Sequence, residues 1–247
     1  MPSVGSAAFA RCIVIGGTGA LGRVLCRTLA GRGARVGLTY RADEATARAL
    51  ESEIGASIAR LDVTAVGDVA RAVDDLEGAL GGPADALVYA AAIGSGEVPP
   101  VYDRLATVGA EAWDRVMAVN VRGAFFAVQR FARAGRPGNV VLLGSTDGEK
   151  SVPSPPPYAT SKAALSGMAR SLSKELGPMG VRINVVAPGL LEGGASDPVP
   201  ESVRVEYLKH SGAKRYGKHE EVASWIAWLA LENSYVTGRT MILDGGL

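Results

Sequence analysis

Seven short apolar runs recur along the chain, and each has the length of a strand. Most of them are continuous rather than alternating between apolar and polar side chains, which is typical of strands buried on both faces in parallel sheets. The runs are Cys12 to Ile15, Arg35 to Tyr40, Ser57 to Leu61, Ala86 to Ala90, Asn139 to Leu143, Arg182 to Val186 and Thr240 to Leu243.

Helical patterns lie between these runs. In the first, Leu21, Leu25 and Leu29 recur at helical spacing, and Gly31 marks the end. Because strand and helix alternate throughout, the sequence predicts a three-layer, doubly wound α/β fold of about seven parallel strands with helices on both faces. The other helical segments are Ala42 to Ile54, Gly67 to Leu80, Ala110 to Ala134, Tyr158 to Leu176 and His219 to Leu231.

The chain of 247 residues is 47% apolar and 21% charged, which suffices for a buried core without disulfides or metal. No repeat, low-complexity tract or long linker divides it, so we predict a single domain over residues 1–247. Cys12 and Cys26 are expected to be small buried hydrophobes of a reducing compartment. Trp225 and Trp228, at helical spacing, are expected in the core or in a subunit interface.

The 26 basic and 25 acidic side chains leave a formal charge of +1. Without a block of Lys and Arg, we expect no nucleic-acid partner. No apolar run approaches the ~18 residues of a membrane span, and the N-terminal segment lacks a signal-peptide pattern, so we expect a cytoplasmic protein without membrane attachment. The two histidines, His210 and His219, are expected at the surface, and no metal site is expected.

Two stretches are predicted as surface loops. Gly94 to Gly109 contains Pro99 and Pro100, and Gly189 to Gly212 contains Pro198 and Pro200. In an open α/β sheet such loops lie over the carboxyl ends of the strands, where ligands bind. The second loop is a candidate substrate lid.

A glycine-rich turn follows the first strand. Ile15 precedes Gly16-Gly17-Thr18-Gly19-Ala20-Leu21-Gly22, and a helix begins within that segment. Glycines permit a tight turn and close approach of the backbone to a pyrophosphate, whose charge is held by amides at the helix N-terminus. After a buried strand and before an amphipathic helix, this turn predicts dinucleotide binding.

The ends of the second and third strands bear on the choice of cofactor. The second ends in Thr39-Tyr40-Arg41, without the acidic residue that would accept the ribose hydroxyls of NAD. An arginine there can bind the extra phosphate of NADP, so Arg41 favours NADPH; the alternative is an ordinary solvated arginine. Asp62, at the end of the third strand, can accept the adenine amino group or cap the following helix.

Three residues suggest proton-transfer chemistry. Ser145 follows the fifth strand, Tyr158 comes later, and Lys162 lies four residues beyond Tyr158 on the same helix face. A free phenol has a pKa near ~10, and a neighbouring ammonium is expected to lower the pKa of Tyr158. Ser145 can then hydrogen-bond a substrate oxygen while Tyr158 delivers or removes its proton.

From about Arg11 onward, the chain resembles the short-chain dehydrogenases/reductases, which have a Rossmann-type fold. The matching segments are the glycine-rich turn at 16–22, Asp62-Val63, Val119-Asn120-Val121, Ser145, Tyr158-Ala159-Thr160-Ser161-Lys162, Pro188-Gly189, Thr237-Gly238 and Asp244-Gly245-Gly246. This resemblance implies a catalytic set of Ser145, Tyr158 and Lys162. Lys162 would also hold the nicotinamide ribose, and Asn120 would support a water-mediated proton relay to Lys162.

The resemblance also implies where the cofactor lies. Pro188 and Gly189 would flank the nicotinamide ring, whereas Val63, Ala90 and Ala91 would line the cofactor elsewhere. The chemistry implied is hydride transfer to or from a carbonyl carbon. Family members commonly form a homotetramer (or a homodimer) built partly from paired helices, here Glu111 to Ala134 and Tyr158 to Leu176.

Four features depart from the family pattern. The glycine-rich turn has Ala20 where most simple members of the family have a glycine. In this respect it resembles the turn of polyketide ketoreductase domains. Tyr89-Ala90-Ala91-Ala92 replaces Asn-Asn-Ala-Gly, which leaves open how the fourth strand is braced. Pro188-Gly189 lacks the following threonine that contacts the nicotinamide amide, and Ser196 is a candidate replacement. Pro155-Pro156-Pro157 either starts the catalytic helix or forms a wall of the substrate pocket.

We therefore predict NADPH-dependent reduction of a small-molecule ketone to a secondary alcohol. Similarity to 3-oxoacyl-acyl-carrier-protein reductases and polyketide ketoreductases suggests a β-ketoacyl thioester or polyketide-like substrate. An acyl carrier protein would meet Arg122, Arg130 and Arg133, which otherwise form a solvated helix face. The alternatives are an NADP-dependent dehydrogenase of a sugar, steroid or other secondary alcohol, and a catalytically silent NADP(H)-binding sensor. Asp147 and Glu149 either line the pocket mouth or are ordinary surface carboxylates.

Overall fold

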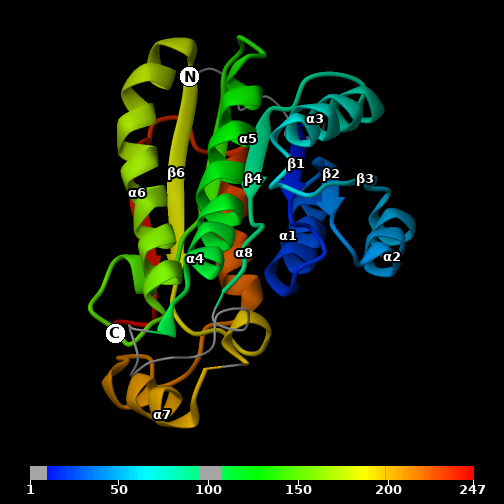
Figure 1. The fold of residues 1–247 in the computed structure, drawn as a ribbon. Coiled ribbons are helices and arrows are strands. Elements are labelled where there is room, and N and C mark those ends of the chain that lie inside the picture. Colours follow the sequence, from blue (N-terminus) through cyan, green and yellow to red (C-terminus); the bar gives the residue numbers. More distant parts are fainter. Residues whose placement is uncertain (1–9, 95–106, 198) are drawn as a thin grey trace.

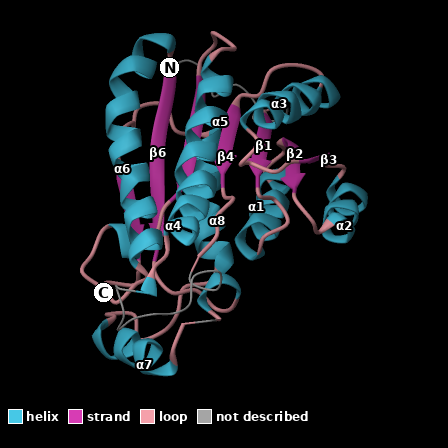
Figure 2. Cartoon of the chain, viewed as in Figure 1, coloured by secondary structure: helices cyan, strands magenta, loops and turns pink. Residues whose placement is uncertain are grey.

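The sheet contains seven parallel strands, which confirms the fold class predicted from the apolar runs. The computed structural model describes residues 10–94, 107–197 and 199–247, and helices cover both faces of the sheet (Figures 1 and 2). The strand order is β3-β2-β1-β4-β5-β6-β7. The strands are β1 (Arg11–Ile15), β2 (Arg35–Tyr40), β3 (Ser57–Arg60), β4 (Ala86–Tyr89), β5 (Gly138–Leu143), β6 (Val181–Pro188) and β7 (Thr240–Leu243).

The helices follow the predicted alternation with the strands. They are α1 (Ala20–Gly31), α2 (Glu44–Ile54), α3 (Val66–Leu80), α4 (Ala110–Met117), α5 (Gly123–Ala132), α6 (Pro156–Leu176), α7 (Glu201–His210) and α8 (His219–Leu231). None of these described helices is long and apolar enough to cross a membrane.

Side chains of β1 alternate between two cores. Ile13 and Ile15 pack with residues of α3, α5 and α6 on one face of the sheet. Cys12 and Val14 pack with α1, α2 and α8 on the other face. Because both faces are covered, β1 is a continuous apolar run. Cys12 and Cys26 are both buried and unpaired, as expected.

The strand order reverses beside β1, and this reversal positions the site. Ile13 pairs with Gly37 of β2 on one side and with Leu87 of β4 on the other. In open α/β sheets, ligands bind beyond the carboxyl ends of the strands at such a switch point. The turn after β1 and the segment after β4 therefore border the same crevice.

The helix predicted over 110–134 is interrupted. A π-helical turn, Ala118–Arg122, separates α4 from α5. Such a turn inserts one extra residue and frequently occurs at functional sites. Here it contains Asn120, one of the residues singled out in the sequence.

The prediction of a loop over Gly189 to Gly212 is wrong in part, because the stretch contains α7. Pro200 resembled a loop signal, but it stands directly before the first turn of α7, where proline is tolerated. Tyr207 is the buried residue of this helix, so the sequence has no apolar stripe that would predict α7. Figure 1 places α7 beyond the carboxyl ends of the strands. Most of the other predicted loop, 95–106, lies outside the described residues.

The two tryptophans of α8 have different environments. Trp228 packs against the core on its face of the sheet, as expected. Trp225 is 48% exposed, and its ring meets that of Trp228 edge-on with centroids 6.2 Å apart. Trp228 is therefore a core residue, and the subunit-interface alternative for Trp225 stays a prediction.

Candidate active site

The glycine-rich turn lies against the segment after β4. Gly16 donates its N–H to Oγ1 of Thr39 at 3.1 Å, which ties the turn to β2. Gly16 has φ +87°, and a Cβ at this position would lie 2.6 Å from the nitrogen of Ala91, so glycine is required. α1 then begins at Ala20 with neither a side-chain cap nor an acidic residue in its first turn. The first amide groups of α1 are therefore suited to an anionic group.

A cavity of about 220 Å³, called here the outer cavity, extends from this turn to the ends of β2 and β3. Oδ1 of Asp62 accepts the backbone N–H and the hydroxyl of Thr64 at 2.9 and 2.7 Å. These bonds and, more weakly, the nearby Arg41 hold the pKa of Asp62 below its usual value. Asp62 thus both caps the turn before α3 and lines the cavity. The predicted cofactor residues that line this cavity are Gly16, Thr18, Gly19, Arg41, Asp62, Val63, Ala90 and Ala91.

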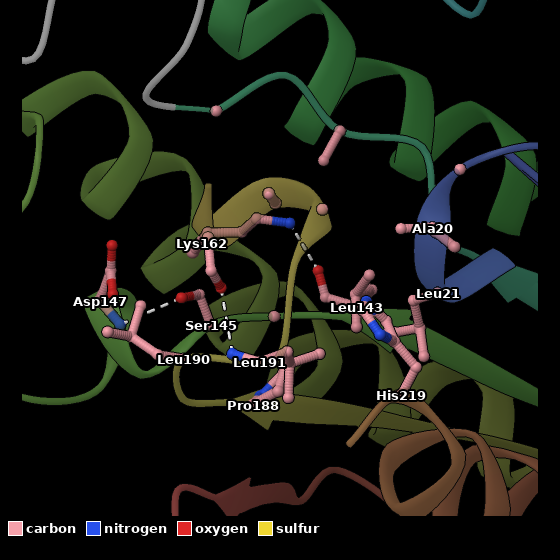
Figure 3. A pocket seen from close by; sticks show the side chains of 18 of the residues that line it. Ala20, Leu21, Leu143, Ser145, Asp147, Lys162, Pro188, Leu190, Leu191 and His219 are labelled. Carbon is pink, nitrogen blue, oxygen red and sulfur yellow. Dashed lines mark hydrogen bonds between the residues drawn. The ribbon is translucent and has the colours of Figure 1, made fainter. Parts of the chain in front are cut away.

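A second cavity of about 360 Å³, called here the reaction cavity, adjoins the first (Figure 3). Both cavities are lined by Gly16, Gly19, Ala90 and Ala92, so together they form one slot along the carboxyl ends of the strands. The predicted site residues that line the reaction cavity are Gly16, Gly19, Ala20, Leu21, Gly22, Ala90, Ser145, Tyr158, Lys162, Pro188 and Gly189.

Ser145, Tyr158 and Lys162 meet in the reaction cavity. Ser145 is buried two residues after the end of β5, and its Oγ accepts the N–H of Asp147 at 3.3 Å. Lys162 is 2% exposed, and its Nζ lies 5.5 Å from the centre of the Tyr158 ring. That Nζ donates to the carbonyl of Leu143 at 2.7 Å, as Figure 3 shows. The three candidate side chains thus surround a space that a small carbonyl group can enter.

The pKa of Tyr158 is raised, which corrects the expectation that Lys162 lowers it. Burial is the main cause and the charge of Asp147 adds to it, whereas a hydrogen bond with Ser145 acts in the opposite direction. Burial lowers the pKa of Lys162 to about 8, with Asp147 opposing that change. The ammonium donates to Leu143 rather than to the phenol oxygen, so it gives the phenolate little support. Tyr158 is therefore held as a neutral phenol.

Asn120 holds the backbone that borders the cavities. Its Oδ1 accepts the N–H of Ile93, and its Nδ2 donates to the carbonyl of Ile93, both at 2.9 Å. The same Nδ2 donates to Oγ of Ser161 at 3.0 Å, and that hydroxyl donates to the carbonyl of Tyr158 at 2.7 Å. Asn120 thereby links the segment after β4 with the first turn of α6.

Comparison with known families matches residues 17–247 to the model described as Enoyl-(Acyl carrier protein) reductase. The chain belongs to the short-chain dehydrogenase/reductase family. This confirms the resemblance drawn from the motifs, and it makes the chain a member of a family of oxidoreductases.

Three relatives show how far the likeness extends. The cyclic-di-GMP-binding biofilm dispersal mediator protein of Escherichia coli is 35% identical over 241 residues, 94% of each chain. The 3-oxoacyl-[acyl-carrier-protein] reductase MabA of Mycobacterium tuberculosis is 30% identical over 239 residues, 95% of this chain and 91% of that one. The crystal structure of BdcA in complex with NADPH has a TM-score of 0.84 at 32% identity, covering 97% of this chain and 96% of that one.

Other braces replace the asparagines that this short-chain dehydrogenase/reductase lacks after β4. The buried hydroxyl of Tyr89 donates to the carbonyl of Val119 at 2.6 Å. The N–H of Ala90 donates to Ile15 at 2.9 Å. Together with the Asn120 bonds to Ile93, these contacts fix the end of β4 and the segment after it.

His219 is a cavity residue that sequence reasoning missed. It was expected at the surface, but it is half-buried and lines the reaction cavity near Ala20 and Gly194 (Figure 3). Its sequence neighbours Lys218 and Glu220 are exposed, so no local pattern signals this position. His210 is exposed, as expected.

The family departures after β6 and before α6 also meet the reaction cavity. Ser196 lines it, and its Oγ accepts the N–H of Leu191 at 3.0 Å, which leaves the hydroxyl hydrogen available. Pro155 lines the cavity, whereas Pro156 begins α6. The proline run therefore both starts α6 and lines the reaction cavity, and its role as a wall of the substrate pocket stays a prediction.

Of the three arginines predicted to meet an acyl carrier protein, only Arg130 has its charge paired in the described parts of the chain. Arg130 forms ion pairs with Asp74 and Glu77, and Arg122 donates to the carbonyl of Thr64 at 3.2 Å. Arg133 is exposed.

Among residues 10–94, 107–197 and 199–247, no group of three or more His, Cys, Asp or Glu side chains could hold a metal ion.

Proposed function

We propose that this chain reduces a ketone to a secondary alcohol with NADPH, with Tyr158 as the proton donor. The observation that carries the proposal is the slot itself. Its outer part contains the features expected for a dinucleotide, and its inner part brings Ser145, Tyr158 and Lys162 around one space. A ketone that enters this space is within reach of a proton donor and of the cofactor's reactive end.

The cofactor is NADPH. The uncapped N-terminus of α1 suits a pyrophosphate, and Arg41 lines the outer cavity where the adenosine phosphate would lie. No acidic residue ends β2, although Asp43 caps α2 nearby. BdcA, whose structure this chain resembles, contains NADPH.

When bound, NADPH supplies the hydride that adds to the carbonyl carbon. Oγ of Ser145 accepts the N–H of Asp147, so its own hydrogen can be donated to the substrate oxygen. Tyr158, held neutral by burial, gives its proton to the developing alkoxide, which is a stronger base than a phenolate. A high phenol pKa favours this direction over abstraction of a proton from an alcohol. Lys162 has ammonium hydrogens besides the one bound to Leu143, and these would hold the nicotinamide ribose.

The substrate class is a β-ketoacyl thioester or a polyketide-like ketone. The support is the likeness to MabA, which is named a 3-oxoacyl-[acyl-carrier-protein] reductase. For an acyl carrier protein, the predicted patch of Arg122, Arg130 and Arg133 is reduced, because Arg130 is already paired with Asp74 and Glu77. Arg122 and Arg133 then offer the exposed charges, since Arg122 donates to a neutral carbonyl.

We propose that the chain forms a homotetramer or homodimer through α4, α5 and α6. Trp113 of α4 and Phe125 of α5 are 37% and 38% exposed, which suits an apolar contact between copies. Size-exclusion chromatography with light scattering would test the assembly. We propose that residues 1–247 form one domain and that the protein is cytoplasmic.

Two other functions compete with this proposal. One is an NADP-dependent dehydrogenase of a sugar, steroid or other secondary alcohol, which a substrate panel separates from a reductase. The other is an NADP(H)-binding sensor, favoured by the relative named for binding cyclic di-GMP. The presence of Asn120, Ser145, Tyr158 and Lys162 together argues against a silent sensor.

The deciding experiment is NADPH and NADH oxidation by the purified protein with a β-ketoacyl thioester, with a cyclic ketone and without substrate. The variant Tyr158→Phe is measured beside the wild type. Thioester-dependent and NADPH-selective turnover that needs Tyr158 is the expected result. Tight NADPH binding without turnover of either ketone would contradict the proposed activity and favour the sensor, which cyclic di-GMP binding would then test directly.

A further inference from the structure

A third cavity of about 550 Å³, called here the side cavity, lies between the segment after Ser145 and α7. Its apolar wall includes Val152, Pro153 and Val203. Three residues, Asp147, Leu190 and Val199, line both the side cavity and the reaction cavity. A substrate whose carbonyl reaches Ser145 and whose remaining chain enters the side cavity therefore passes these three side chains.

Asp147 is the charged residue at this junction. Its carboxylate accepts the hydroxyl of Ser154 at 2.7 Å, and no ion pair to it is found in the described parts of the chain. The other charged residues of the side cavity are engaged: Lys150 with Asp244 at 2.5 Å, and Glu206 with Lys209 and His210 at 3.3 and 3.1 Å. A half-buried carboxylate with a single hydroxyl partner can accept further hydrogen bonds.

We propose that Asp147 determines substrate specificity: its carboxylate accepts a hydrogen bond from an amide or hydroxyl group of the substrate, and it excludes ketones that carry a negative charge at the same position. This inference rests on the proposed ketone reduction. It adds a requirement on the substrate arm that lies beyond the reacting carbonyl.

Electrostatics support both halves of the proposal. The charge of Asp147 acts on both Tyr158 and Lys162, raising the pKa of each group relative to the effect of burial alone, so its field reaches the reacting groups. In a partly desolvated site, like charges repel strongly, and hydrogen bonds to a carboxylate are about twice as strong as neutral ones. A thioester arm with amide N–H groups satisfies this carboxylate, whereas a carboxylate-bearing arm does not.

The test uses three acetoacetyl thioesters that share the reacting ketone. Their thiols are N-acetylcysteamine, which has an amide N–H, butanethiol, which has no polar group, and 3-mercaptopropionate, which has a carboxylate. For the wild type, kcat/KM is expected to fall in that order. In Asp147→Asn, the ratio between the amide and carboxylate thioesters is expected to fall by about 10- to 100-fold. Asp147→Glu, which keeps the charge, is expected to retain the preference.

Glu149→Gln is the matched control. Glu149 lies on the same segment but lines neither cavity, and it accepts the hydroxyl of Ser166. Its substitution removes an equal charge and is expected to change the ratio by less than about twofold. The backbone N–H of Asp147 that holds Ser145 is the same in every variant, and thermal unfolding verifies that each one is folded.

The outcomes separate this inference from the proposed function. If Asp147→Asn turns over the thioesters with the wild-type ratio, the role of Asp147 is refuted while ketone reduction stands. If the wild type turns over none of them, ketoacyl reduction is refuted. Calorimetric binding of the three matching 3-hydroxybutyryl thioesters to the NADP-loaded protein then decides on the role of Asp147. If the wild type binds them in the expected order of affinity and Asp147→Asn loses that order, the role is supported. If the wild type binds all three with equal affinity, the role is refuted.

Discussion

The side-chain amide of Asn120 binds the backbone of Ile93 on both sides, accepting its N–H and donating to its carbonyl at 2.9 Å each. This pairing forces the segment after β4 into one position against the π turn. Ile93 lines the outer cavity. Asn120 is therefore a structural support of the slot, whereas the proton relay that family resemblance implies for it stays a prediction.

Asn120→Asp is expected to destabilise the protein and to weaken NADPH binding. A carboxylate can accept the N–H of Ile93 but cannot donate to its carbonyl or to Ser161, so buried acceptors lose their donor at a cost of about 2 to 3 kcal/mol. Urea unfolding measures the free energy, and fluorescence titration measures NADPH affinity.

Asn184→Asp controls for general destabilisation. Asn184 is equally buried and bridges Val236 and Arg239, but it lines neither part of the slot. The Asn184→Asp variant should be less stable than the wild type without a specific loss of NADPH affinity. Equal NADPH affinity in both variants, measured well below their unfolding temperatures, would contradict the supporting role of Asn120.

Tyr158→Phe is expected to lower kcat by at least about 100-fold, because it removes the proton donor. The ring remains, so the dissociation constant of NADPH should stay within about twofold. Stopped-flow oxidation of NADPH measures kcat, and fluorescence titration measures the dissociation constant of NADPH. Tyr235→Phe, at a side chain 92% exposed, is the control and should match the wild type. Retained turnover in Tyr158→Phe would exclude this mechanism.

Arg41→Ala is expected to weaken NADPH by about 10- to 100-fold and NADH by much less, because an exposed guanidinium in the outer cavity would pair with the additional phosphate. Titration of the wild type and the variant with both nucleotides gives the ratio of the two losses of affinity. Arg48→Ala removes an equal charge from α2, where the side chain is paired with Glu44 and Glu51 outside the slot. Equal losses for the two nucleotides would mean that Arg41 does not bind the phosphate.

The sequence predicted the sheet well because the strands are buried on both faces, as Cys12 to Ile15 illustrate. The slot could also be anticipated, since the turn at 16–22 and Ser145 follow strands whose carboxyl ends share one edge. α7 was missed because it buries little apolar surface and begins after Pro200. The position of His219 was missed because it depends on how α8 packs beside α1, a tertiary contact without a local pattern.

The pKa of Tyr158 shows a different limit of sequence reasoning. Spacing placed Tyr158 and Lys162 on one helix face correctly, but it could not show that Nζ of Lys162 turns toward Leu143. Nor could it show that burial outweighs the charge of a neighbour. Electrostatic effects depend on distances and desolvation that only the folded chain defines.

Gly123→Ala is expected to destabilise the protein by about 1 to 3 kcal/mol through overpacking. A Cβ at Gly123 would lie 2.4 Å from the hydroxyl oxygen of Tyr89, which is itself bound to Val119. Tyr89→Phe removes that oxygen, so the double variant should recover part of the loss, although Val63 still crowds the site. A double-mutant cycle by urea unfolding measures the coupling. Strictly additive losses would contradict the steric explanation.

The buried Lys162 is expected to make stability depend on alkaline pH. Burial lowers its pKa to about 8 in the folded chain, against 10.5 for a solvated lysine. Below pH 8 both states hold the proton, so there is no proton-linked difference between them. Between pH 8 and 10.5 the unfolded chain retains a proton that the folded chain has released, so the free energy of unfolding contributed by this group rises with pH.

Lys162→Met isolates this contribution, because methionine fills a similar volume without a titratable group. The free energy of unfolding of the wild type minus that of the variant should increase by on the order of 3 kcal/mol from pH 8 to pH 10.5 and stay level below pH 8. Urea unfolding across that range measures it. Lys174→Met, on a more exposed turn of α6, is the matched control for the loss of a lysine from this helix. A difference for Lys162→Met that stays flat with pH would mean that the ammonium is not desolvated as its burial beside Leu143 indicates.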